Sequence, residues 1–286
     1  MTTQPELLGE HRCFGGRQRF YRHDSAEIGL PMRFSVFLPP QAESGQQVPA
    51  LLYLAGLTCN EETFMTKAGA QGLAAELGLA LIAPDTSPRG ANISGEADNW
   101  DFGLGAGFYL DATQQPWARH YRMESWLTEE LLKLIETTVP VGASRIGIFG
   151  HSMGGHGALT LALRHPGLFK SVSAFAPICA PSQCPWGEKA FSGYLGADRS
   201  EWAKHDASAL MAAAEAAPFA GGILIDQGLD DKFLDDQLNP HLFEDACALV
   251  RQPLTLRRHA GYDHGYYFIS TFMADHLKHH AVQLGI

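Results

Sequence analysis

Residues 145–154 read Arg-Ile-Gly-Ile-Phe-Gly-His-Ser-Met-Gly, and they constrain the fold more than any other segment of the chain. The apolar run at 145–149 predicts a buried strand, and the pattern at 155–164 predicts a helix. Between them stands G-x-S-x-G, which in a strand–turn–helix context places a serine at a sharp turn. Ser152 is therefore a candidate nucleophile at a helix N-terminus, where free N–H groups and the helix dipole favour developing negative charge. The alternative is a tight turn with a passive serine.

The rest of the chain alternates between short apolar runs and helical patterns. The runs predict further strands at 33–38, 50–55, 79–83, 172–176, 223–225 and 254–256. The helical patterns lie at 63–77, 123–137, 155–164, 201–216, 240–250 and 268–284. This alternation predicts an α/β fold, with a mostly parallel central sheet and helices on both faces. The polar segment at 41–47 is interpreted as a hairpin loop, which predicts antiparallel strands at the N-terminal edge. We expect one domain, 1–286, with its chemistry on loops beyond the carboxyl ends of the strands.

The composition is that of a globular protein, with 286 residues of which 45% are hydrophobic and 18% charged. The chain has 31 acidic residues and 21 Lys and Arg, so its formal net charge is −10. It contains no run of basic residues. Nucleic-acid binding is therefore disfavoured, and an acidic ligand needs local Arg or Lys. We see no signal-peptide pattern, and no apolar run approaches the roughly 20 residues of a membrane span. The five cysteines form no C-x-x-C pair, so we expect free thiols in the reducing cytoplasm and no zinc-ribbon site.

A serine nucleophile needs a base, and His264 is the candidate. It lies in the glycine-flanked segment 261–267, between the last predicted strand and the last helix. His259, closer to the strand, is interpreted as structural. His276, His279 and His280 have a helical spacing that could suit a metal. We favour instead a solvated face near a helix C-terminus, where positive charge is stabilised.

The base in turn needs an acid, which in serine hydrolases with this motif stands between the serine and the histidine in the chain. Four aspartates lie in or near the loop after the strand at 223–225: Asp226, Asp230, Asp231 and Asp235. Asp226, at the strand end, is interpreted as structural. Asp231 is favoured and Asp230 is the alternative, because spacing alone does not separate them. Asp263, beside the histidine, is assigned a capping or loop role.

Acyl transfer also needs N–H donors for the oxyanion. The backbone amide of Met153, directly after the nucleophile, is one candidate. The other is the amide of Leu57, in the loop after the strand at 50–55. Gly56 there supports this assignment, although it could be only a turn glycine.

Cys59 lies two residues beyond Leu57. A free cysteine is usually a small buried apolar residue. Its place near the predicted site also makes it a candidate for contact with the substrate and for modification. We hypothesise that alkylation or a mixed disulfide at Cys59 blocks the acyl pocket.

Two long loops, 85–109 and 179–187, are rich in aromatic residues. Long loops in compact domains are often functional. Trp100 and Trp186 are therefore candidate substrate-binding residues. Phe108 and Tyr109 are further candidates for the cleft wall, and Arg89 or Lys189 for its charge. The alternative is that each aromatic ring packs into a local core.

Taken together, several segments resemble the S-formylglutathione hydrolase family, also called esterase D. They are 54–60 (Leu-Ala-Gly-Leu-Thr-Cys-Asn), 84–90 (Pro-Asp-Thr-Ser-Pro-Arg-Gly), 100–109 (Trp-Asp-Phe-Gly-Leu-Gly-Ala-Gly-Phe-Tyr), 149–159 (Phe-Gly-His-Ser-Met-Gly-Gly-His-Gly-Ala-Leu), 173–179, 184–187, 225–228 and 261–268. This resemblance extends from about Cys13 to the last helix. It implies a cytosolic α/β-hydrolase that cleaves S-formylglutathione to glutathione and formate, that acts broadly on small aryl esters, that needs no cofactor or metal, and that is often a homodimer.

Carried over position by position, the resemblance makes Ser152 the nucleophile, His264 the base and Asp231 the acid, with the amides of Leu57 and Met153 as oxyanion donors. The alternative enzyme is a general carboxylesterase acting on small acyl esters without glutathione specificity. Two further interpretations are a non-catalytic binding protein and an enzyme that transfers the acyl group to an alcohol.

Overall fold

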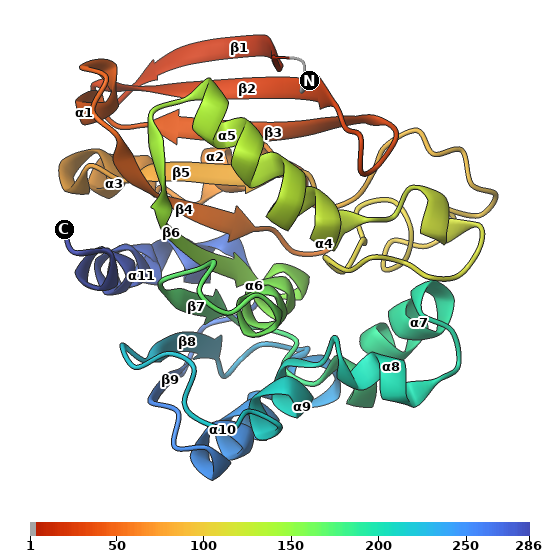
Figure 1. Cartoon of the computed structure of the whole chain (residues 1–286). Helices are drawn as coiled ribbons and strands as arrows, with labels where there is room; N and C mark the ends of the chain where they lie inside the picture. The colour runs from red at the N-terminus through yellow and green to blue at the C-terminus, as the bar shows by residue number, and fades with distance from the viewer. Residues whose placement is uncertain (1–3) are drawn as a thin grey trace.

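The computed structural model describes residues 4–286, and in this range nine strands form one sheet (Figure 1). The strands are β1 (Glu6–Cys13), β2 (Gly16–Asp24), β3 (Pro31–Leu38), β4 (Val48–Leu54), β5 (Ala80–Pro84), β6 (Val141–His151), β7 (Val172–Phe175), β8 (Ile223–Gly228) and β9 (Leu254–His259). Their spatial order is β1-β2-β3-β5-β4-β6-β7-β8-β9. β1, β2 and β3 pair antiparallel, as do β3 and β5, and all later neighbours pair parallel.

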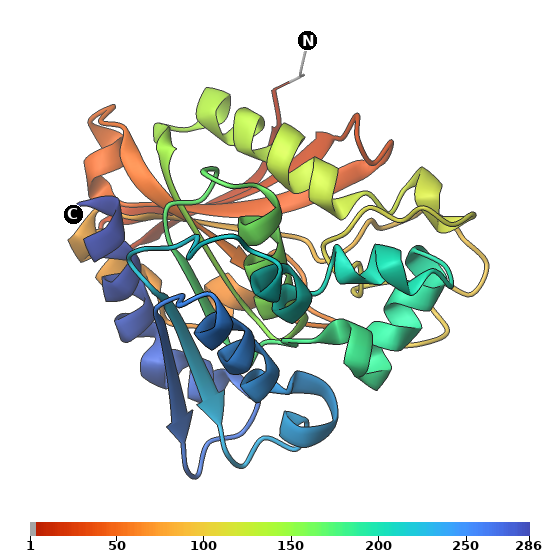
Figure 2. The ribbon, with the colours of Figure 1, turned by 60° about the horizontal axis from the view of Figure 1, so that its bottom comes forward.

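Helices cover both faces of this sheet (Figure 2). They are α1 (Pro40–Glu43), α2 (Thr63–Lys67), α3 (Gln71–Leu77), α4 (Met123–Ser125), α5 (Leu132–Thr138), α6 (Met153–Arg164), α7 (Pro185–Tyr194), α8 (Arg199–Ala203), α9 (Ala207–Ala212), α10 (Pro240–Leu249) and α11 (Tyr266–Leu284). α3 and α11 pack together on one face, and α5, α6 and α10 lie on the other. This architecture confirms the predicted α/β fold with an antiparallel N-terminal edge. No helix in the described range is long and apolar enough to cross a membrane.

The predicted hairpin across residues 41–47 is wrong. β5 lies between β3 and β4, pairing antiparallel with the former and parallel with the latter, and the polar segment contains α1. Every residue of β4 is buried, as expected of a strand in the middle of a sheet. The antiparallel edge is built instead by β1, β2 and β3. Neither β1 nor β2 was predicted. Most residues of β1 are exposed, and neither strand carries an apolar run.

Two predicted helices are each divided in two. The pattern at 63–77 forms α2 and α3, because Gly69 between them adopts φ +66°, outside the helical region. The pattern at 201–216 falls on α8 and α9. Asp206 caps α9 by accepting a hydrogen bond from the Ala209 amide at 3.0 Å, so a new helix starts there.

The turn from β6 into α6 is pressed against the carboxyl end of β4. Gly150 pairs with Leu54 in the sheet, and Gly154 lies on the same strand end. A Cβ atom at Gly154 would stand 1.9 Å from the carbonyl oxygen of Leu54, and one at Gly150 would stand 2.2 Å from that of Gly154. Hydrogen alone fits at these two positions, so the motif glycines are required by packing.

Gly154→Ala should lower the free energy of unfolding by about 3 kcal/mol or more, because the new methyl group overlaps a backbone oxygen that the sheet holds in place. Gly142→Ala is the matched control, since the nearest atom to its new Cβ is Gln47 Oε1 at 3.8 Å. Chemical denaturation of both variants measures the difference. Equal stability of the two proteins would contradict this account of the turn.

The three histidines of α11 do not form a solvated face. His276 and His280 are fully buried, and His279 is half-buried, with a ring nitrogen 3.1 Å from the carbonyl oxygen of Val172. In the described range no group of three or more His, Cys, Asp or Glu side chains is arranged to hold a metal ion. Sequence spacing placed these residues on one side of the helix. It did not show that this side packs on the sheet.

Hydrogen bonds link these histidines into a buried chain. Ser171 Oγ lies 2.6 Å from His280 Nδ1, and His280 Nε2 lies 2.8 Å from Ser173 Oγ. Ser173 Oγ lies 2.8 Å from His276 Nδ1, and His276 Nε2 donates to Asp226 at 3.3 Å. With both imidazoles neutral, every link is satisfied when each hydroxyl donates to an Nδ1 atom and each Nε2–H donates onward, the last to the Asp226 carboxylate, which only accepts.

Asp226 ends this chain and is held from the other side by Arg257, with two contacts of 2.6 Å. Hydrogen bonds from His276 and Arg257 lower the pKa of its carboxyl group against the opposing effect of burial. His259 also contacts Asp226 at 3.2 Å and stacks on Phe272 at 3.8 Å. The structural interpretations of Asp226 and His259 are confirmed.

Stability should fall as the pH drops below about 6.5, the unfolded value for histidine. Burial lowers the pKa of His280 and of His276, so below that pH the unfolded chain binds protons that the folded chain does not. Each such histidine contributes a slope of about 1.4 kcal/mol per pH unit. Denaturation of the wild type and of His280→Gln between pH 5 and 7 measures this slope. A variant slope equal to that of the wild type would contradict the buried neutral state.

Candidate active site

Ser152 lies between β6 and α6 in a backbone conformation that few side chains adopt. Its φ and ψ angles are +58° and −119°, and it is the N-cap of α6. The backbone is tied on both sides, since the Ser152 amide donates to the Phe175 carbonyl at 3.0 Å and its carbonyl accepts from the His156 amide at 2.9 Å. These bonds hold the strained turn in place.

His264 and Asp231 are joined by a hydrogen bond, His264 Nδ1 to Asp231 Oδ2 at 2.5 Å. The Asp231 carboxylate is fully buried, and its other oxygen accepts from the Phe233 amide at 2.9 Å. The neighbouring Asp230 is exposed and accepts from the Gly261 amide at 3.2 Å. Of the two acids that spacing left open, the structure therefore places Asp231 against the imidazole.

Ser152 and His264 open into the same small cavity, of ≈ 150 Å³. Its lining is Gly56, Leu57, Cys59, Trp100, His151, Ser152, Trp186, Phe233, His264 and Tyr266. The lining is mainly apolar. The rings of Trp100 and Trp186 meet edge to face, with their centroids 5.6 Å apart. A cavity of this size holds an acyl group of a few atoms beside the serine.

The two candidate oxyanion donors flank Ser152. Gly56 stands so close that a Cβ atom there would lie 3.3 Å from Ser152 Cβ, which brings the following Leu57 amide beside the nucleophile. Met153 follows the serine directly at the first position of α6. Within residues 4–286 no hydrogen bond engages the amide of Leu57 or of Met153. Both donors are therefore available to a substrate oxygen, as an oxyanion hole requires.

Not every predicted cleft residue reaches this cavity. Phe108 and Tyr109 are buried in the core instead, where the Tyr109 hydroxyl donates to the Ala55 carbonyl at 2.7 Å. Lys189 lies outside the lining and contacts Asp101 at 2.5 Å. Arg89 faces a different cavity.

Three lining residues were missed from the sequence: His151, Phe233 and Tyr266. His151 precedes Ser152 in the G-x-S-x-G motif, and Tyr266 follows Gly265 in the segment that carries His264. Their closeness in the chain to the predicted catalytic residues could have indicated them. His151 is buried, with its ring centroid 4.4 Å from that of His264. Burial and the nearby imidazole lower its pKa well below the usual range, so a neutral ring packs against the candidate base.

Cys59 lines the cavity beside these groups. Burial raises the pKa of its thiol, against the opposing effect of a hydrogen bond with Thr63. A raised pKa reduces the thiolate fraction at neutral pH and slows alkylation. The hypothesis that modification of Cys59 blocks the cavity stays a prediction.

Comparison with known proteins identifies the family. The Esterase family model matches residues 25–279. The S-formylglutathione hydrolase of Mus musculus is 56% identical over 278 residues, covering 97% of this chain and 98% of the relative, and that of Bos taurus is 54% identical with the same coverage. The chain belongs to the S-formylglutathione hydrolase family. The predicted family is thereby confirmed, and with it the prediction of a hydrolase.

The solved structure of an S-formylglutathione hydrolase from Agrobacterium tumefaciens extends this relation to the backbone. It superimposes with a TM-score of 0.94 at 50% identity, covering 98% of this chain and 100% of that one. A ferulic acid esterase shares the fold alone, with a TM-score of 0.75 at 18% identity. The similarity to this enzyme therefore includes the antiparallel edge of the sheet as well as the end that carries Ser152.

Asp231→Asn should lower kcat for p-nitrophenyl acetate about 10³- to 10⁴-fold, because an amide cannot hold His264 in the tautomer that accepts the serine proton. Asp230→Asn is the matched control. It keeps an oxygen for the Gly261 amide and should retain activity. Steady-state rates of both purified variants measure the contrast. An equal loss in the two variants would contradict the assignment of Asp231.

Proposed function

We propose that this chain hydrolyses the thioester S-formylglutathione to glutathione and formate through a formyl-enzyme on Ser152. The observation that best supports this proposal is the small cavity beside Ser152. The chain is also more than half identical to a mammalian S-formylglutathione hydrolase. A formyl group is the smallest acyl group, so a cavity of ≈ 150 Å³ suits it better than a long acyl chain. Specificity then depends on the glutathione half, outside this cavity.

In the acylation step, His264 accepts the Ser152 proton through Nε2 as Oγ bonds to the formyl carbon. The buried Asp231 carboxylate stabilises the imidazolium through its bond with Nδ1. The Leu57 and Met153 amides donate to the developing oxyanion. The C–S bond then breaks, and glutathione leaves as a thiolate that takes the proton from His264.

Deacylation repeats these roles with water as the nucleophile. His264 accepts a proton from the water as its oxygen bonds to the formyl carbon, and Ser152 Oγ leaves and recovers that proton. Formic acid leaves, carrying the second proton of the water, and ionises to formate in solution, and the site returns to its first state. Trp100 and Trp186 are proposed to wall the acyl pocket, and Cys59 to contact the substrate there, because all three line the cavity.

A cytoplasmic location and a homodimer are also proposed. The described cysteines, Cys13, Cys59, Cys179, Cys184 and Cys247, are free thiols, which suits the reducing cytoplasm. The homodimer implied by the family resemblance stays a prediction.

The kcat/KM of the wild type for S-formylglutathione should exceed that for p-nitrophenyl acetate, and Ser152→Ala should lose both by several orders of magnitude. Steady-state assays with the two substrates measure the preference. Equal or weaker turnover of the thioester would instead favour a general carboxylesterase. Near-normal activity of Ser152→Ala would exclude the proposed nucleophile altogether.

A further inference from the structure

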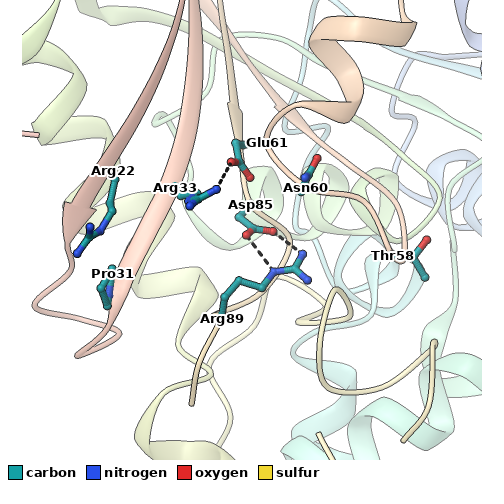
Figure 3. A pocket seen from close by; sticks show the side chains of 8 residues that line it. All are labelled: Arg22, Pro31, Arg33, Thr58, Asn60, Glu61, Asp85 and Arg89. Atoms are coloured by element: carbon teal, nitrogen blue, oxygen red, sulfur yellow. Dashed lines mark hydrogen bonds and ion pairs between the residues drawn. The ribbon is translucent and has the colours of Figure 1, made fainter. Parts of the chain in front are cut away.

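Figure 3 shows a second cavity, of ≈ 530 Å³, which is larger than the acyl cavity. It is lined by Arg22, Pro31, Arg33, Thr58, Asn60, Glu61, Asp85 and Arg89. β3 begins where the antiparallel β5 ends, with Phe34 paired to Pro84. The cavity therefore opens at the carboxyl end of β5, the same edge of the sheet that carries Ser152.

One loop, residues 56–60, forms a wall of both cavities. Leu57 and Cys59 line the acyl cavity, and the alternating Thr58 and Asn60 line the larger one. The segment is a tight turn, in which the Cys59 amide donates to the Gly56 carbonyl at 3.3 Å and Thr58 adopts φ +67°. The turn therefore stands between the two cavities and presents side chains to each. A ligand anchored on one side needs only to pass over a single segment of backbone to reach the other.

Contacts from the larger cavity hold this loop in place. The Cys59 carbonyl accepts hydrogen bonds from Thr86 Oγ1 at 2.5 Å and from Arg89 Nη2 at 3.1 Å. Arg89 in turn makes two contacts with the buried Asp85 carboxylate, at 2.7 and 3.0 Å. The Arg89 guanidinium is thus committed to the protein, and it neutralises one of the two acids of the cavity.

The remaining charges are poorly paired. Arg33 lies 3.9 Å from Glu61, beyond hydrogen-bond distance. Arg22 has only exposed acids near it, Glu6 at 3.6 Å and Asp24 at 3.9 Å. The Glu61 side chain is 5% exposed, and burial raises its pKa. The cavity thus offers guanidinium donors and a desolvated carboxylate side by side, in a chain whose net charge is −10.

We propose that this cavity binds the α-amino-acid end of the γ-glutamyl arm of the substrate, with its carboxylate on Arg33 and Arg22 and its ammonium on Glu61. An adjacent cation and anion match a zwitterion, whereas a simple carboxylate leaves Glu61 without a partner. This inference rests on the proposed function, and it names the residues that recognise the leaving group.

The dimensions of the arm agree with this placement. Peptide units extend about 3.3–3.6 Å per residue, so the two units from the cysteine sulfur to the glutamyl α-carbon span roughly 7 Å or more. β5 and β4 lie between β3, which carries Arg33, and β6, which leads into Ser152, so three strand spacings of about 4.8 Å, roughly 14 Å, separate these two strands. The arm covers part of this distance from Ser152, and the long side chain of Arg33 reaches toward it from the other end.

Arg33→Gln tests the proposal directly, because the side chain is 55% exposed and its loss leaves no buried group unpaired except Glu61. Its KM for S-formylglutathione should rise about tenfold, the usual effect of losing a hydrogen bond between charged groups. The kcat/KM for p-nitrophenyl acetate, which has no peptide arm, reports on the catalytic centre in the same sample. Arg12→Gln, an exposed arginine on β1 with 66% exposure, is the matched control and should behave as wild type with both substrates.

A second comparison separates the two ends of the glutamyl group. Glu61→Gln should raise the KM for S-formylglutathione but not for its N-acetylated analogue, whose amine carries no charge. Arg33→Gln should raise the KM for both substrates, since the carboxylate is present in each.

Three results would overturn the assignment of this cavity. An unchanged KM in Arg33→Gln, with the thioester preference of the wild type intact, would leave the proposed function standing and remove the subsite. An equal loss on thioester and ester would make Arg33 merely structural. A wild type without thioester preference would remove the proposed function, and the subsite with it.

Discussion

The close contact between the turn at Ser152 and the end of β4 is the constraint on which the site depends. Gly154 leaves no room for a methyl group against the Leu54 carbonyl, so α6 starts in direct contact with the sheet. The serine must then take a left-handed conformation, which its hydrogen bond to Phe175 holds. A larger separation between α6 and β4 would relax that conformation. Packing of glycine against backbone thus fixes the position of Ser152, the proposed nucleophile, before any side-chain contact does.

Loop 56–60 connects the end of β4 to both cavities. It follows β4 directly, supplies the Leu57 amide and the Cys59 side chain to the acyl cavity, and presents Thr58 and Asn60 to the charged cavity behind it. Bonds from Thr86 and Arg89 to the Cys59 carbonyl fix its backbone. The loop therefore adjoins both the proposed oxyanion donor and the proposed place for the leaving group. A rigid donor matters because it needs no reorganisation when charge develops.

The sequence predicted what depends on local pattern. The G-x-S-x-G turn, the parallel strands around it and the loop position of His264 follow from residue order and spacing. It failed where the answer depends on what lies across the fold. Asp230 and Asp231 are chemically identical neighbours, and only the path of the chain turns one of them toward His264. The spacing of His276 and His280 showed one helix face without showing that it packs on buried serines. The supposed hairpin at 41–47 failed because β5, distant in sequence, lies between its two strands.

The central claim is that the serine held in this turn carries the formyl group during turnover. Mixing the enzyme with S-formylglutathione, quenching in acid within one turnover and mapping the peptides by mass spectrometry tests it most directly. The account predicts a formyl ester on the peptide that contains Ser152, formed and lost at rates consistent with steady-state turnover. A formyl group on Cys59, the other nucleophilic side chain of the cavity, or efficient turnover without any formylated Ser152 peptide, would contradict it.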